Sequence, residues 1–117
     1  MGNSAEECAG ELTRAGAFAV GANCGDLGPM QTAAVVTLLR GATDLPVLAQ
    51  PNAGKPKLAD GRTVFDMSPP DFARGIEACL RAGARLVGGC CGTSPEHMRA
   101  VAAVLQDFKG GYDDAEN

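Results

Sequence analysis

Three cysteines have the spacing and surroundings expected of a metal centre. Cys24 directly follows the apolar run 17–22, and Cys90 and Cys91 stand side by side in the glycine-rich segment 88–93. Three thiolates around one zinc ion leave a fourth position open, which is typical of catalytic rather than closed structural sites. Two other interpretations of the adjacent pair stay open at this point: two unrelated core thiols, or a strained vicinal disulfide.

The charge of such a centre indicates its chemistry. Zinc(II) with three cysteine thiolates carries one net negative charge, so it would be a poor Lewis acid for generating hydroxide. A substrate thiol would bind there as a thiolate at neutral pH and would keep much of its nucleophilicity. The sequence therefore predicts alkyl transfer to sulfur by in-line displacement.

The remaining cysteines and the single histidine receive structural interpretations. Cys8 and Cys79 lie on the apolar faces of predicted helices, so we expect them in the core. His97 stands in the first turn of a predicted helix among polar neighbours, so we expect it on the solvated surface. The cysteine count of five is odd, and in a reducing cytoplasm we expect thiols or ligands rather than disulfides.

The elements that must position these residues alternate between helix and strand. We expect strands at 17–22, 45–50 and 84–89, and helices opening at Ser4, Pro29, Ser68 and Ser94. This alternation predicts an α/β fold with a parallel sheet and crossover helices. Because the strands are continuously apolar, we expect cover on both faces of the sheet. The segment 51–67 is predicted to be a long loop.

The candidate ligands all follow predicted strands. The segments 23–24, 51–54 and 88–93 come directly after the three strands, and the ends of successive parallel strands meet at one edge, where ligands bind. Cys24 and Cys90 can therefore meet although they are far apart in sequence. For Cys90 and Cys91 to share one metal the chain must bend, and the glycines of 88–93 permit this.

The motifs at these three strand ends are similar to those of a known family. The segments 21–24, 51–54 and 88–93 read Gly-Ala-Asn-Cys, Pro-Asn-Ala-Gly and Gly-Gly-Cys-Cys-Gly-Thr. Together they resemble the homocysteine S-methyltransferase (homocysteine-binding domain) family, from about residue 4 to 108. The segments 44–47 and 51–54 are closest to the homocysteine module of cobalamin-dependent methionine synthase.

The resemblance implies a TIM (β/α)8 barrel, of which this chain would supply about the last three βα units. It implies zinc bound by Cys24, Cys90 and Cys91, and methyl transfer to the thiol of homocysteine to give methionine. It also implies substrate-binding roles for Asn52, Asn23 and Gly89. Asn52 could occupy the open metal position or contact the amino acid substrate, and the alternative is a plain turn residue.

The chain is much shorter than the family domain, which has eight βα units. Unpaired sheet edges predict self-association, or a partner chain that supplies the missing barrel strands. The methyl donor is not identified by the sequence: it could be a methylated amine or sulfonium, or methylcobalamin on a separate domain or corrinoid protein. The alternative function is a non-catalytic zinc-binding barrel fragment, or a subunit that completes a split methyltransferase.

Length, charge and composition limit the remaining function classes. The 117 residues fit one small domain, which we place at 1–109, followed by an acidic disordered tail at 110–117. The net charge of −4 and scattered basic residues argue against nucleic acid binding. No apolar run approaches the ~20 residues of a membrane helix. The polar N-terminus does not resemble a secretory signal, so we expect a cytoplasmic protein.

Overall fold

The computed structural model describes residues 4–23 and 27–116, with side chains up to Phe108. Its elements follow in the order α1 (Ala5–Arg14), β1 (Val20–Asn23), α2 (Pro29–Ala42), β2 (Val47–Gln50), β3 (Lys57–Ala59), β4 (Arg62–Val64), α3 (Pro69–Ala82), β5 (Leu86–Val87) and α4 (Pro95–Glu116). The predicted α/β alternation is confirmed. The local signals that predicted it are also present, since the Ser4 hydroxyl accepts a hydrogen bond from the Glu7 N–H at 3.1 Å and caps the N-terminus of α1.

The main sheet is parallel, as predicted, with the strand order β1-β2-β5. β2 lies in the centre, where Val20 to Asn23 of β1 pair in register with Val47 to Gln50. On its other side Leu48 and Ala49 pair with Leu86 and Val87. β5 is shorter than the predicted strand at 84–89, although the Gly88 N–H beyond its end still donates to the Ala49 carbonyl at 3.0 Å.

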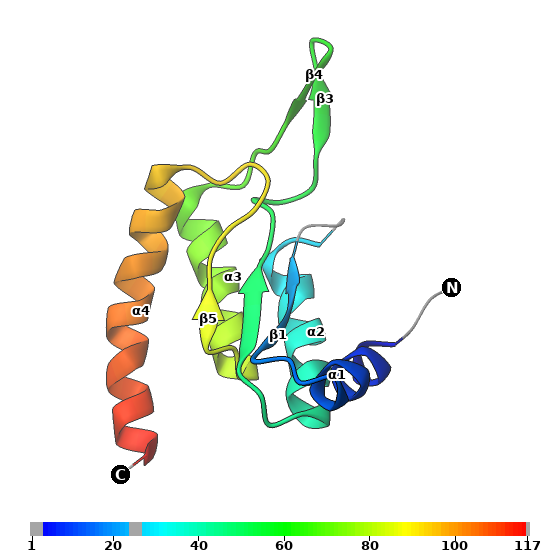
Figure 1. Cartoon of the computed structure of the whole chain (residues 1–117). Coiled ribbons are helices and arrows are strands. Elements are labelled where there is room, and N and C mark those ends of the chain that lie inside the picture. Colours follow the sequence, from blue (N-terminus) through cyan, green and yellow to red (C-terminus); the bar gives the residue numbers. More distant parts are fainter. Residues whose placement is uncertain (1–3, 24–26, 117) are drawn as a thin grey trace.

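Helices cover only one face of this sheet within the described residues. α2 and α3 pack behind the strands, α1 lies against α2, and α4 lies against α3 (Figure 1). Side chains alternate accordingly along β2, where Val47 and Ala49 are buried and Leu48 and Gln50 are only half-buried. We call the side that carries Leu48 and Gln50 the open face. We predicted cover on both faces, and these residues supply it on one.

The predicted loop at 51–67 is wrong in part, because it contains a hairpin. β3 and β4 pair antiparallel and project beyond the sheet as a two-stranded arm (Figure 1). The turn residues Asp60 and Gly61 have φ angles of 52° and 77°, as tight hairpin turns require. A 2.7 Å ion pair between Lys57 and Asp66 joins the two sides of the arm and lowers the pKa of the Asp66 carboxyl.

The C-terminal helix also extends further than we predicted. α4 continues to Glu116, whereas we expected a disordered tail from residue 110. The two adjacent glycines at 110 and 111 each disfavour a helix by about 1 kcal/mol but do not end this one, and no proline follows Pro95 to interrupt it.

Within the described part of the chain, no helix combines the length and apolar character needed to cross a bilayer.

Candidate functional site

The turn after β5 is joined directly to the segment after β2. The Cys90 N–H donates to the Pro51 carbonyl at 3.0 Å, and the Ala53 N–H donates to the Cys91 carbonyl at 2.9 Å. Between them, the Cys91 N–H donates to the side-chain Oδ1 of Asn52 at 3.1 Å. Two segments that are distant in the sequence thus form one hydrogen-bonded unit at the carboxyl edge of the sheet.

Asn52 is the central residue of this unit. Its side chain is only 2% exposed, so its amide depends on protein partners for hydrogen bonding. The bond from the Cys91 N–H fixes the backbone on which the adjacent thiol stands. The observed role of Asn52 is therefore to position the cysteine turn, and its predicted contact with metal or substrate stays a prediction.

The cysteine turn bends as the glycine pattern predicted. Gly92 has a φ of 82°, which lies in the left-handed region that favours glycine. The carbonyl of Cys90 accepts two hydrogen bonds from Thr93, one from its N–H at 3.3 Å and one from its hydroxyl at 2.8 Å. A Cβ on Gly89 would lie 2.6 Å from the Thr93 methyl carbon, so a side chain there would displace Thr93.

The base of the hairpin packs on the same turn. A Cβ on Gly92 would lie 2.3 Å from Cβ and Cγ of Phe65, which follows β4. This close approach connects the arm to the candidate site. No feature that we used from the sequence predicted this contact.

The thiols at the site differ in exposure. Cys90 is half-buried and Cys91 is exposed. Cys24 lies outside the described residues, but it directly follows Asn23, which pairs with Gln50 at the end of β1. Among the residues that the structure describes, no three His, Cys, Asp or Glu side chains lie close enough to hold a metal. The described part shows two adjacent thiols, Cys90 and Cys91, and thiols are soft donors of the kind that zinc binds.

The other two described cysteines lie elsewhere. Cys79 is fully buried in α3 and its thiol lies 3.4 Å from the Pro29 carbonyl, which confirms its predicted core position. Burial raises the pKa of the Cys79 thiol to about 11, so this group stays protonated at neutral pH and is a poor metal ligand. Cys8 is half-buried in α1.

We predicted that His97 lies on the solvated surface, and this prediction is wrong, because the residue is only 8% exposed. Its Nε2 donates to the Met67 carbonyl at 2.7 Å, and its Nδ1 accepts from the Ser94 N–H at 3.2 Å. Its ring also meets the edge of Phe72 at a centroid distance of 5.5 Å. His97 thereby connects the segment before α4 to the segment that follows the hairpin. Its polar sequence neighbours gave no sign of this packing, since the partners come from distant segments.

Replacing His97 with alanine is expected to lower the free energy of unfolding by about 2–3 kcal/mol, because a buried ring and several hydrogen bonds are lost. Urea denaturation followed by circular dichroism measures the change. Arg99→Ala is the matched control in the same helix, since the Arg99 side chain is 76% exposed. The control is expected to change stability by less than about 0.5 kcal/mol. Equal effects of the two substitutions would contradict the role assigned to His97.

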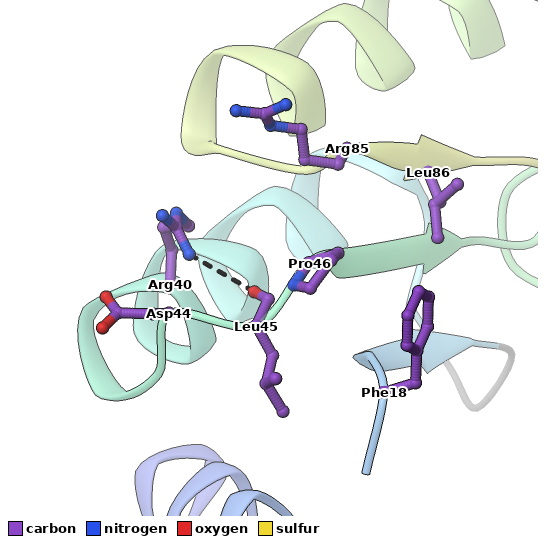
Figure 2. Close-up of a pocket in the computed structure, with 7 residues that line it drawn as sticks. All are labelled: Phe18, Arg40, Asp44, Leu45, Pro46, Arg85 and Leu86. Carbon is purple, nitrogen blue, oxygen red and sulfur yellow. Dashed lines mark hydrogen bonds between the residues drawn. The ribbon is translucent and has the colours of Figure 1, made fainter.

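A hollow lies at the opposite edge of the sheet, where the strands begin. It is lined by Phe18, Arg40, Asp44, Leu45, Pro46, Arg85 and Leu86 (Figure 2). Arg40 donates to the carbonyls of Thr43 and Leu45 at 3.1 and 3.3 Å, so it closes the end of α2. Figure 2 shows Phe18 and Leu86 extending toward one another over β2, and these side chains are 87% and 47% exposed. This hollow is separate from the cysteine turn, because parallel strands place the two at opposite ends.

Comparisons with known proteins agree on one family. The family model described as homocysteine S-methyltransferase matches residues 1–105. Methionine synthase from Mycobacterium tuberculosis is 35% identical over 91 residues, which cover 77% of this chain and 8% of that protein. Homocysteine S-methyltransferase 4 from Zea mays is 35% identical over 104 residues, covering 82% of this chain and 28% of that protein.

A solved structure is similar in fold as well as in sequence. The crystal structure of the homocysteine methyltransferase MmuM from Escherichia coli, in its oxidized form, matches with a TM-score of 0.61 and 31% identity. The match covers 84% of this chain and 29% of that one. The chain therefore spans less than a third of the length of each of these relatives.

Proposed function

The chain belongs to the homocysteine S-methyltransferase family, and on that basis we propose that it carries the thiol-activating end of a zinc-dependent enzyme that methylates homocysteine to methionine. The observation that supports this most strongly is the hydrogen-bonded unit formed by Pro51, Asn52 and the cysteine turn. It holds two adjacent thiols at the carboxyl edge of a parallel sheet, where the active sites of such folds lie.

Zinc would be held by Cys24, Cys90 and Cys91, and when bound it would supply an ionised substrate thiol. The residues of this chain provide the placement. Asn52 and the Pro51 carbonyl hold the backbone N–H groups of both cysteines of the turn, so the two thiols stand on a fixed backbone. Asn23 and Gly89 line the substrate position beside them. Such preorganisation matters because small displacements of reacting groups cost large factors in rate.

The methyl donor belongs to parts of the assembly other than the described residues. A methylated sulfonium or amine, or methylcobalamin on a separate domain or corrinoid protein, each fits transfer to a thiolate. One relative is a methionine synthase, and it is far longer than this chain.

The fold that we propose for the complete enzyme is a (β/α)8 barrel, of which these strands form the C-terminal part. The open face supports this, because in a barrel the inward side of each strand packs against side chains from other strands. Its amino end is apolar, with Phe18, Leu48 and Leu86, and its carboxyl end carries the amides of Asn23 and Gln50. Further barrel strands, on the same chain or on a partner or second copy, would cover this face and pair with β1 and β5.

A second candidate function follows from the outer edges of the same sheet. The chain could be a non-catalytic zinc-binding subunit that completes a split methyltransferase. The sheet supports this, since among the described strands nothing pairs with the outer sides of β1 and β5.

Methionine formation separates the two functions. The zinc-loaded chain is incubated with homocysteine and with a methylated sulfonium, a methylated amine or methylcobalamin in turn, alone and with the N-terminal part of the MmuM barrel. We expect methionine to form with at least one donor, and to form faster once added strands cover the open face. If zinc binds but no methionine forms in any combination, the catalytic proposal is refuted and the non-catalytic one is supported.

A further inference from the structure

One row of residues crosses the open face at the carboxyl end of the strands. Asn23 and Gln50 pair across β1 and β2, and Gly88 continues the row toward β5 through its hydrogen bond to Ala49. In the sequence, Pro51 comes after Gln50, Cys90 stands two residues after Gly88, and Cys24 comes after Asn23. Gln50 is the central member of this row.

The side chain of Gln50 leans toward the strand that carries the cysteine turn. A Cβ built on Gly88 would lie 3.3 Å from Nε2 and 3.5 Å from Cγ of Gln50, so the amide lies over the position that a side chain on Gly88 would fill. Gln50 is half-buried, and its amide makes no hydrogen bond within the described part of the chain. The residues that the structure describes thus give no hydrogen-bond partner to this polar group, which lies over Gly88.

We infer that the Gln50 amide holds the amino acid end of the thiol substrate. This rests on the proposed function, since it takes the substrate sulfur to lie at Cys90 and Cys91. The Pro51 carbonyl binds the Cys90 N–H, so the thiol turn begins one residue beyond Gln50. A short amino acid thiol anchored there extends its other end over this row.

The chemistry of an amide suits that end of the molecule. Its NH2 group donates to a carboxylate and its carbonyl accepts from an ammonium group, without adding a charge of its own. A site built to hydrogen-bond a polar group rejects analogues that lack it, because its own polar atoms are then left without partners. Gln50 is therefore a specificity residue that distinguishes homocysteine from a simple alkanethiol.

The test compares two thiols and two matched substitutions in the full chain in its purified, zinc-loaded assembly. Gln50→Leu removes the polar atoms at similar size, and Gln106→Leu makes the same change at an exposed position of α4. Binding of homocysteine and of propanethiol is measured by calorimetry, together with zinc content. We expect Gln50→Leu to weaken homocysteine binding about tenfold, as for hydrogen bonds to charged groups, and to leave propanethiol binding and zinc content unchanged. Gln106→Leu should leave the binding of both thiols unchanged.

A second variant guards against an indirect effect of Gln50→Leu on folding. Gly88→Ala leaves the chemistry of Gln50 intact and displaces its amide, so it should weaken homocysteine binding in the same direction by a smaller factor. If the Gln50→Leu variant binds homocysteine as tightly as wild type does, or if it binds both thiols more weakly by the same factor, the role of Gln50 is refuted. If the wild-type assembly binds neither thiol, the proposed function itself fails.

Discussion

Replacing Cys90 with serine is expected to abolish tight zinc binding by the chain. The substitution removes one of three proposed thiolate ligands and leaves a hydroxyl, which does not ionise near neutral pH and is a harder donor than sulfur. The N–H and carbonyl of residue 90 make backbone hydrogen bonds in the turn, and serine keeps both groups, so the fold of the turn should persist. We expect Cys24→Ser and Cys91→Ser to act in the same way.

The control substitutions change thiols that lie outside the proposed centre. Cys8→Ser and Cys79→Ser should both retain about one zinc per chain. Cys79→Ser is the more demanding control, since it places a hydroxyl in the core and should cost some stability without affecting zinc. Zinc per chain is measured by mass spectrometry after dialysis against a chelator of moderate strength. Equal zinc loss in the ligand variants and in both controls would refute the assignment of the three cysteines.

The parts of the fold that the sequence predicted correctly depend on local signals. The capping pairs at Ser4 and Ser68 are confirmed by hydrogen bonds over three residues, and Gly83 ends α3 with a φ of 117°. The parallel order of the strands follows from their alternation with helices, and it brings the segments after β2 and β5 together. The cysteine turn could be predicted because its residues stand at strand ends, and this position is a consequence of topology.

The features that the sequence analysis missed depend on packing between distant segments. His97 is buried by residues that precede and belong to α3, and the Gln50 side chain lies over Gly88 across the sheet. Neither relation is visible in neighbouring residues. The hairpin is a different case, since its Asp60–Gly61 turn is a strong local signal that we overlooked within a segment interpreted as a loop.

The assembled enzyme is expected to bind homocysteine as a thiolate through its sulfur, and so to show thiol methylation rather than hydrolysis. The reason is the charge of the proposed centre. A zinc site with neutral ligands acidifies water strongly because the metal keeps most of its positive charge. Three thiolates remove that charge, so water at such a site should stay largely un-ionised near neutral pH. A thiol has an ordinary pKa of ~8.5 and needs only a small shift to ionise.

Two measurements on the zinc-loaded assembly check this expectation. Calorimetry in buffers of different ionisation enthalpy should report close to one proton released for each homocysteine bound at neutral pH, because the free substrate is mostly protonated and the bound form is not. X-ray absorption at the zinc edge should show a shell that grows from three sulfurs to four when homocysteine is added. Serine has the same amino acid group without the thiol, so as a control ligand it should produce neither change. A shell that keeps three sulfurs under saturating homocysteine would mean that the substrate sulfur is not the fourth ligand of zinc. The charge of the centre would then not explain why the enzyme selects a thiol over water.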